Sequence, residues 1–337
     1  MEKVTMKDVA RRAGVSYATV SRALSGSPEI SAQTRERVLR ICEEMNFTPN
    51  VLARSMVMKR TDTLGVIMAA IDNPFMSELA NYIELYARRR GYNLMLCNSS
   101  YDPVQERKSM ELLVSRQADG VIVIPFGGES YENLSPLLDR VPTLFLSENM
   151  AGFPVDSVSV DNARGTYLGT DYLYELGHRR ILYLGRRRKS VAHEQRARGY
   201  LNACATHGLV PEFLDSAYSR SSVETGYLLA REYFAKPLAH SAIYCATDSL
   251  AIGVMKAADE AGIRIPEDLS LIGFDNISFT SLPRLDLTTV DQPKERMAAA
   301  AVDRLLEKIA DPDSPFVHHI LEPTLVERSS CRRVEEE

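Results

Sequence analysis

The chain has 337 residues, of which 45% are hydrophobic and 25% charged, a composition typical of a globular protein with more than one hydrophobic core. Its apolar stretches are much shorter than the roughly 18 to 20 residues of a membrane span, and its first residues do not lead into an apolar signal core. The five cysteines are scattered and contain no CxxC pair, which argues against a disulfide framework and a thiolate zinc site. We therefore expect a cytoplasmic protein with reduced thiols.

The net charge of −5 conceals two regions of opposite sign. Residues 1–60 hold 11 Lys and Arg against 6 Asp and Glu, a net charge of +5, whereas the remainder carries −10. A basic segment on an acidic body indicates that only the first part approaches a polyanion, because phosphate neutralisation supplies sequence-independent affinity. A basic face is often only a solvated one, so charge alone is weak support.

Three short helices are predicted in the first 47 residues. Thr5-Met-Lys-Asp8 fits a capping box that opens the first helix, and Gly14 ends it. Ser16 can cap a second helix from Tyr17 to about Leu24, and Ser31 can cap a third whose apolar residues recur at helical spacing. Two short helices joined at a glycine form a helix-turn-helix, and the third helix closes its core.

Beyond Pro49 we expect a short helical segment at residues 50–57, a linker to residue 62, and then β-branched runs that alternate with amphipathic helices. This alternation predicts parallel α/β sheets, and there are too many units for one sheet. The expected strands are at 65–70, 94–97, 120–124, 181–184, 242–245 and 269–272, and expected helices include 162–176, 194–207, 222–234 and 248–261.

The predicted fold class is thus α plus α/β. A three-helix headpiece (1–47) and a hinge helix with its linker (48–62) precede two doubly wound parallel α/β subdomains. The first subdomain is expected at 63–162 with 290–325, and the second at 163–289.

The sequence of residues 5–24, TMKDVARRAGVSYATVSRAL, closely resembles the opening of the lactose-repressor (LacI/GalR) family. The resemblance covers essentially the whole chain. It continues through 50–56, 119–124, 160–162, 176–181, 196–200, 248–253 and 270–276 to 288–293. It implies a DNA-reading headpiece, a hinge helix and a core like that of periplasmic sugar-binding proteins, crossed by three chain segments, with an effector bound between the subdomains.

The helix-turn-helix geometry places the first residues of the second helix, Tyr17 and Ala18, at base edges in the major groove. Arg22 can form a bidentate contact with guanine, while Ser16, Thr19 and Ser21 suit phosphate oxygens. The alternative is that Arg22 is merely solvated. The resemblance adds Thr5, Asn50, Arg54 and Met56 to the expected DNA contacts.

The hinge segment is about eight residues long, below the roughly 12 to 15 at which isolated helices become marginally stable. It should fold only with DNA or a partner. In the family, paired hinge helices wedge an apolar side chain, usually Leu, into the minor groove, and Met56 occupies that position here. Met56 could instead pack on the core as part of a linker.

Polar residues at strand ends are the candidate effector ligands, because ligands of open α/β sheets bind beyond the carboxyl ends of the strands. Carried over by motif, the expected effector contacts are Phe75, Asp161, Arg196, Ser221, Thr247, Asp275 and Gln292, the last on the third chain crossing. A carboxylate facing a guanidinium suits a polyhydroxyl ligand, which indicates a sugar-like effector. Asp161 and Asp248 could instead cap the helices that follow them.

Two departures from the family bear on the ligand. Ser221 and Ser222 stand where purine-binding members place a stacking aromatic, which makes a nucleobase less suitable. Arg186-Arg-Arg-Lys189 places four cations near the expected cleft, so a sugar phosphate is a second hypothesis beside a neutral sugar. The alternative for this charge run is a solvated loop.

Other classes of protein fit less well. We find none of the GxGxxG, Walker A, HExxH and GxSxG motifs, and the histidines form no metal pattern, so we expect no enzyme, cofactor or metal site. A periplasmic solute-binding protein would share the body but not the headpiece, and a ligand-independent DNA binder would not release DNA with a ligand. We predict a transcriptional repressor that binds a palindromic operator as a homodimer. A small sugar-like effector bound between the two core subdomains would control its operator affinity allosterically.

Overall fold

The computed structural model describes residues 4–24, 29–45, 47, 60–125, 127–185, 190–215 and 222–334. The chain divides into a small unit, Met1–Thr61, and a large unit, Asp62–Glu337, which are described separately below. The predicted hinge helix with Asn50, Arg54 and Met56 lies outside the described residues, as do Ser221 and the basic run 186–189.

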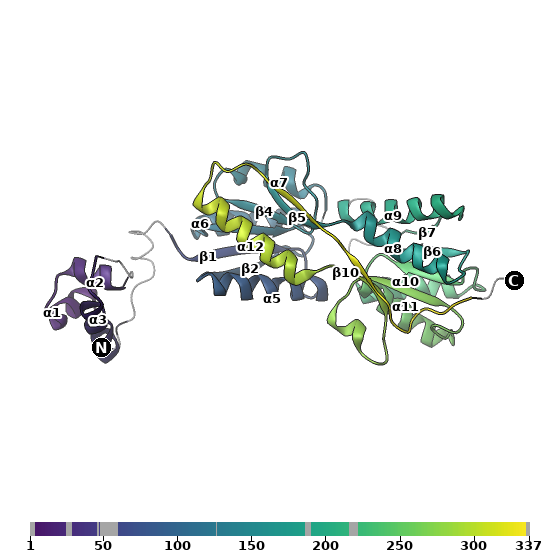
Figure 1. Ribbon diagram of the computed structural model, residues 1–337, viewed down its shortest axis with the longest axis horizontal. Helices are drawn as coiled ribbons and strands as arrows, with labels where there is room; N and C mark the ends of the chain where they lie inside the picture. Colours follow the sequence, from purple (N-terminus) through teal and green to yellow (C-terminus); the bar gives the residue numbers. More distant parts are fainter. Residues whose placement is uncertain are drawn as a thin grey trace. The chain divides into compact units, whose positions relative to one another are not determined.

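The small unit contains three helices, α1 (Met6–Ala13), α2 (Tyr17–Leu24) and α3 (Ala32–Glu44) (Figure 1). Thr5 precedes α1, and its backbone N–H donates to Asp8 Oδ2 over 3.0 Å. Gly14 follows α1 with φ +65°, a left-handed conformation that favours glycine. Ser16 Oγ accepts the Thr19 N–H at the start of α2, and Ser31 Oγ accepts the Thr34 N–H at the start of α3.

The inward faces of these helices form one apolar cluster. Its buried members are Val9, Ala10, Ala13, Val20, Ala23, Val38, Ile41 and Cys42. Met6, Leu24 and Met45 are only partly buried at its margin. The apolar residues at helical spacing in the third predicted helix do face this core.

The first subdomain of the large unit has a six-stranded sheet in the order β11-β5-β4-β3-β1-β2, and every neighbouring pair is parallel. Its elements are β1 (Thr63–Met68), α5 (Pro74–Arg89), β2 (Asn93–Asn98), α6 (Pro103–Ser115), β3 (Gly120–Ile124), α7 (Ser130–Leu138), β4 (Thr143–Leu146), β5 (Asp156–Val160), α12 (Lys294–Ala310) and β11 (His318–Leu321).

The second subdomain has a six-stranded sheet in the order β12-β10-β9-β8-β6-β7, parallel except for the antiparallel edge strand β12. Its elements are α8 (Asn162–Glu175), β6 (Ile181–Leu184), α9 (Val191–His207), β7 (Glu212–Leu214), α10 (Val223–Phe234), β8 (Ala242–Cys245), α11 (Asp248–Ala261), β9 (Ser270–Asp275), the 3-10 helix η1 (Ser278–Ser281), β10 (Thr288–Asp291) and β12 (Thr324–Val326).

Both faces of the first sheet are covered, as its continuous apolar strands require. Val66 and Ile122 lie in the cluster beneath α5 and α12, whereas Ile67 and Val123 lie in the cluster beneath α6 and α7. Successive residues of one strand thus face opposite helical layers.

The chain passes between the subdomains three times, between β5 and α8, between β10 and α12, and between β11 and β12 (Figure 1). This corrects the predicted range 290–325 for the first subdomain, because residues 290–291 of β10 and 324–325 of β12 pair within the second sheet. Gln292 accordingly lies on the second crossing rather than the third. The short antiparallel strand β12 has no hydrophobic period that the sequence could reveal.

Within the described part of the chain, the helices are all too short or too polar to traverse a lipid bilayer.

Candidate DNA-reading surface and effector cavity

One face of α2 carries three exposed residues. Tyr17 is 53% exposed, and Ala18 and Arg22 are also exposed, whereas Val20 and Ala23 on the opposite face are buried. The Arg22 Nε atom lies 3.1 Å from Glu29 Oε2, and the side chains of both residues are largely exposed. The three residues that the sequence assigned to base reading therefore share a surface that a groove could accept.

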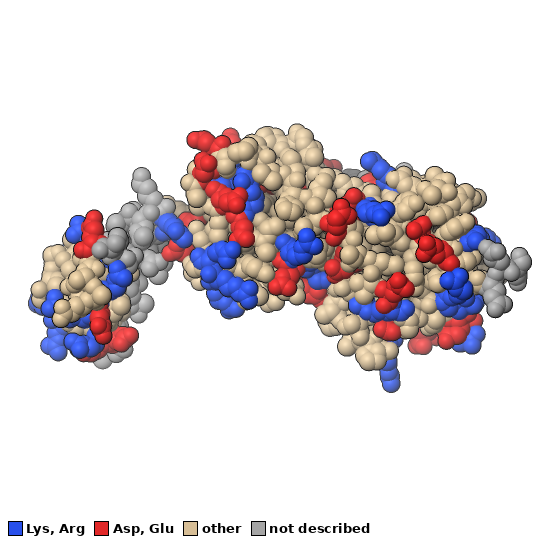
Figure 2. Space-filling model, viewed as in Figure 1, with Lys and Arg blue, Asp and Glu red and all other residues tan. Residues whose placement is uncertain are grey.

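The predicted phosphate ligands Ser16, Thr19 and Ser21 lie at the start of α2 and along it. Ser16 is exposed and caps α2, while Thr19 and Ser21 are half-buried. The Thr5 hydroxyl donates to Asp8 Oδ2 over 2.5 Å, and this hydrogen bond is the main reason that the pKa of Asp8 lies below its usual value. Figure 2 shows Lys and Arg side chains on the visible face of the small unit, with Asp and Glu side chains among them.

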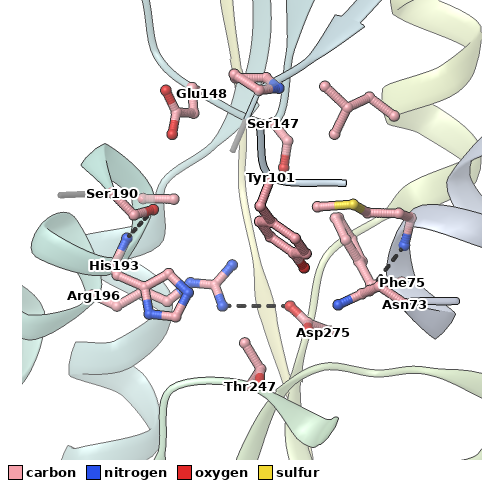
Figure 3. A pocket seen from close by; sticks show the side chains of 14 residues that line it. Asn73, Phe75, Tyr101, Ser147, Glu148, Ser190, His193, Arg196, Thr247 and Asp275 are labelled. Atoms are coloured by element: carbon pink, nitrogen blue, oxygen red, sulfur yellow. Dashed lines mark hydrogen bonds and ion pairs between the residues drawn. The ribbon is translucent and has the colours of Figure 1, made fainter. Parts of the chain in front are cut away.

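A cavity of about 580 Å³, counted to its open mouth, lies between the two subdomains of the large unit. Each lining segment follows a strand or begins a helix at the carboxyl edge of a sheet (Figure 3). The first subdomain contributes Asn73, Phe75, Met76, Tyr101, Ile124, Pro125, Ser147 and Glu148, and the second contributes Ser190, Ala192, His193, Arg196, Thr247 and Asp275.

Arg196 is fixed on the second-subdomain wall of this cavity. Its Nε donates to Asn162 Oδ1 over 2.8 Å, and its Nη1 donates to the Ala246 carbonyl oxygen over 2.6 Å and to Asp275 Oδ1 over 3.4 Å. The guanidinium also lies over the Phe274 ring, 3.8 Å from its centroid. Since Arg196 is only 5% exposed, these contacts replace the water that a buried cation loses.

Asp275, at the end of β9, is the acidic partner of Arg196. Its Oδ1 also accepts a hydrogen bond from Gln292 Nε2 over 2.6 Å. Its backbone has φ +124°, and Asn276 follows with φ +50°, values that residues other than glycine rarely adopt. Such a conformation persists only where surrounding contacts hold it, and it occurs often at binding sites.

A second buried carboxylate, Asp248, lies behind the cavity wall. Its Oδ1 accepts the Thr289 hydroxyl over 2.5 Å, and its Oδ2 accepts the Ile277 N–H over 2.9 Å. Burial raises the pKa of Asp248, and the nearby Asp275 charge raises it further; burial also raises the pKa of Asp275, against the effect of Arg196. Two acids therefore lie close together with a shared tendency to retain a proton.

The structure brings four of the predicted effector residues together at the cavity, namely Phe75, Arg196, Thr247 and Asp275. It does not place Asp161 there: among the described lining residues Asp161 is absent, and its Oδ1 instead accepts the Arg164 N–H as the cap of α8. Gln292 is not among the described lining residues, but its Nε2 donates to the Asp275 carboxylate, which is. Thr247 rather than Asp248 caps α11, because Thr247 Oγ1 accepts the Leu250 N–H.

Several lining residues were not found from the sequence. Tyr101, Ser147 and Glu148 follow β2 and β4, where the strand-end rule could have indicated them. Tyr101 and Ser147 also have positive φ values, +61° and +80°. Neither Tyr nor Ser is a residue type that predicts this backbone conformation. His193 precedes Arg196 by one helical turn and shares its side of α9.

This arrangement offers a small polar ligand fixed hydrogen-bonding groups between apolar walls. In the described lining, the Arg196 guanidinium is a hydrogen-bond donor, while Asp275 and Glu148 supply carboxylate oxygens. Phe75 and Tyr101 from the first subdomain present aromatic surface to the same space (Figure 3). Few polar groups among apolar walls are the usual composition of a small-molecule site.

Two family models match the chain. Residues 5–50 match the model described as bacterial regulatory proteins, lacI family, and residues 170–331 match the periplasmic binding protein-like domain. The ribose operon repressor of Haemophilus influenzae is 33% identical over 329 residues, which cover 97% of this chain and 98% of the relative.

Solved structures of LacI-family proteins are similar to this chain. A crystal structure of the lac repressor dimer bound to operator and the anti-inducer ONPF has a TM-score of 0.86 and 26% identity, covering 98% of this chain and all of that one. A LacI family regulator from Enterococcus faecium with bound ribose has a TM-score of 0.72 and 26% identity, covering 81% of this chain and 100% of that one. The chain therefore belongs to the LacI family of bacterial transcriptional regulators, with an N-terminal helix-turn-helix domain and a periplasmic-binding-protein-like core.

Proposed function

We propose that the protein is a dimeric repressor that reads a palindromic operator through α2 and releases or holds it according to a sugar bound in the cavity. The observation that carries the proposal is the buried Arg196–Asp275 pair on the cavity wall. A guanidinium and a carboxylate held side by side can each engage neighbouring hydroxyls of a sugar through charge-assisted hydrogen bonds. The protein would act in the bacterial cytoplasm, which contains the chromosome.

The described lining favours a neutral sugar over a sugar phosphate. Glu148 is buried and Asp275 lies opposite it, so two carboxylates accompany the Arg196 guanidinium there. A phosphate dianion would meet both carboxylates in a site of low dielectric, where like charges repel strongly. The ribose named for the Enterococcus faecium structure supports a monosaccharide of five carbons as the first candidate.

Operator reading would use the exposed face of α2. Tyr17 and Ala18 would lie against base edges, and Arg22 would donate to a guanine. Ser16, Thr19 and Ser21, with Thr5, Asn50 and Arg54, would contact the backbone, and Met56 would supply the minor-groove wedge.

A second copy of the chain would cover an apolar surface formed by η1 and α11. Phe279 and Leu282 are about half exposed, and the adjoining groove is lined by residues that include Ile252, Met255 and Leu285. Single monomers rarely leave large contiguous apolar surfaces in water. The dimer named for the lac repressor structure supports a symmetric pair with two headpieces.

The test combines operator selection with calorimetry. The full chain would select duplexes from a random pool, and D-ribose, D-xylulose, cellobiose and D-ribose 5-phosphate would then be titrated into it. We expect binding of a neutral monosaccharide and a change in affinity for the selected duplex. Binding of the phosphate alone would refute the neutral-sugar assignment, and failure to select any duplex would refute the function.

A further inference from the structure

Lys294 is a buried cation at the second chain crossing, where α12 begins. It is 8% exposed, and its Nζ donates to the carbonyl oxygens of Asp275, over 2.9 Å, and Asn276, over 2.6 Å. These are the two consecutive residues with positive φ at the end of β9. Lys294 therefore binds the backbone of the segment whose Asp275 side chain lines the cavity.

The same ammonium faces Glu78 on α5. Lys294 Nζ lies 3.4 Å from Glu78 Oε2, while Glu78 Oε1 accepts the Ser278 N–H over 2.8 Å. Glu78 belongs to the first subdomain and Ser278 to the second. One carboxylate that is 23% exposed in its side chain thus joins α5 to both the crossing segment and the turn that follows β9.

The turn after β9 is held by other contacts as well. Asn276 Nδ2 donates to Asp291 Oδ1 over 2.8 Å, and Arg328 Nη2 donates to Asn276 Oδ1 over 2.7 Å. Ile277 is buried in the apolar cluster beneath α5 and α12. A shift of Asp275 would therefore be transmitted to neighbours that are packed and bonded, rather than absorbed by a loose loop.

Helix α5 extends from the cavity to the point where the chain enters the large unit. At one end Asn73 and Phe75 line the cavity. At the other, Arg90 Nη2 contacts Asp303 Oδ1 over 2.7 Å. Beyond the helix end, Asn93, the first residue of β2, donates its N–H to the carbonyl oxygen of Asp62, the first residue of the unit, over 2.7 Å. Because a 16-residue helix is a rigid element, a displacement of Glu78 would also displace both ends of α5.

We propose that the Lys294–Glu78 pair is the positioning contact that transmits cavity occupancy from the Asp275–Asn276 turn to α5, and so to the segment leading to the headpiece. The proposal rests on the proposed function, which supplies the sugar and the operator. Neither residue lines the cavity in the described structure, so both would act through Asp275 and α5 rather than on the ligand.

The test uses the full chain and the operator duplex that the wild type selects. Glu78→Gln keeps an oxygen for the Ser278 N–H but removes the charge that faces Lys294. Tyr86→Phe is the matched control, since the Tyr86 hydroxyl donates to Glu295 over 3.0 Å and so joins α5 to α12 rather than to the turn after β9. Lys294→Met removes the pair from its other side.

The first readout needs no sugar. Because coupling is reciprocal, operator binding should alter hydrogen exchange of the amides at residues 276–278 in the wild type and in Tyr86→Phe, and this response should be lost in Glu78→Gln and Lys294→Met. The second readout is the ratio of operator affinities with and without D-ribose. It should fall from the roughly 5- to 150-fold usual for allosteric proteins toward one in Glu78→Gln, while the D-ribose Kd stays within about threefold.

The outcomes separate the two proposals. A Glu78→Gln protein with wild-type exchange response would overturn the relay, and so would loss of coupling in Tyr86→Phe to the same extent. Loss of D-ribose binding in step with coupling would make Glu78 part of the binding site instead. A wild type that selects no duplex would overturn the proposed function before the relay is reached.

Discussion

Arg22 and Arg196, the two arginines proposed to bind DNA and sugar respectively, differ in how the structure holds their guanidinium groups before the ligand binds. Arg22 in the headpiece has a side chain that is 53% exposed, and its partner Glu29 has one that is 68% exposed. Arg196 in the core is buried and held by Asn162, Ala246 and Asp275. An exposed pair costs little to separate because water and salt already screen it, whereas a buried cation must be oriented before the ligand arrives.

The difference suits two kinds of ligand. DNA is a long polyanion that supplies its own attraction, so Arg22 can exchange an acid for a guanine at small cost. A small sugar makes few contacts, and most of its affinity must come from groups that lose no freedom on binding. Changes in the core should therefore have larger effects on stability and binding than changes on α2.

The largest effect is expected for Arg196→Ala. Removing the guanidinium leaves Asp275 buried without its cation, and breaking such a pair typically costs about 3 to 5 kcal/mol of folding free energy. Sugar binding should be lost as well. Denaturant unfolding and calorimetry would measure both quantities.

Arg198→Ala is the matched control, because Arg198 lies on the same helix, α9, but is exposed. It should change the unfolding free energy by no more than about 0.5 kcal/mol and leave sugar binding intact. Equal effects of the two variants would contradict the role assigned to the buried pair.

The second prediction concerns pH and Asp248. Its pKa is raised to about 7 in the folded protein, mainly by burial, so the folded state holds a proton that the unfolded state releases near pH 4. The stabilising contribution of this proton is complete below the unfolded pKa and disappears as pH rises through the folded one. The contribution of Asp248 to the unfolding free energy should therefore decrease between about pH 4 and pH 7, by at most about 1.4 kcal/mol per pH unit.

Asp248→Asn removes this contribution, so unfolding free energy should decrease less steeply with pH in the variant than in the wild type, which denaturant unfolding at several pH values would show. The Asn oxygen can still accept the Ile277 N–H, and the Thr289 hydroxyl oxygen can accept the new amide N–H once its own hydrogen rotates away. A variant whose slope equals that of the wild type would show that Asp248 does not carry the proton.

The sequence predicted the regular parts of this architecture well. Strand β3 begins at Gly120 and β8 ends at Cys245 as expected, because short apolar runs bounded by helices leave little choice of register. The capping serines before α2 and α3 were likewise identified, since their side chains act on neighbouring residues. Local chemistry is what a single sequence shows best.

The cavity was predicted only in part, because its geometry depends on residues far apart in the chain. Asp161 and Thr247 both follow strands and both cap helices, yet only Thr247 lines the cavity. In the sequence, Asp161 and Thr247 show the same pattern, a polar residue between a strand and a helix. The positive φ of Tyr101 and Asp275 also comes from tertiary contacts, and so no local rule predicts it.

The third prediction returns to α2. Arg22→Ala should relax specificity at one base pair of the selected duplex, costing about 1 to 3 kcal/mol there, because a bidentate contact with guanine is lost. Arg40→Ala is the control, since Arg40 is exposed on α3 and lies 3.9 Å from Glu44. Fluorescence anisotropy with duplexes substituted at each position would measure both. An unchanged base preference in Arg22→Ala would remove the direct-readout assignment.

The smallest effect is expected for Glu29→Gln. The carboxylate 3.1 Å from Arg22 Nε competes with DNA for the guanidinium and adds negative charge to the reading surface. Exposed ion pairs are worth about 0.2 to 1 kcal/mol, so its removal should strengthen operator binding by a few-fold at most and more at low salt. If competition for Arg22 is the cause, the gain should vanish in the Arg22→Ala background. A gain of equal size in both backgrounds would instead identify general repulsion between Glu29 and the phosphates, and the difference between the two regions would then rest on Arg196 alone.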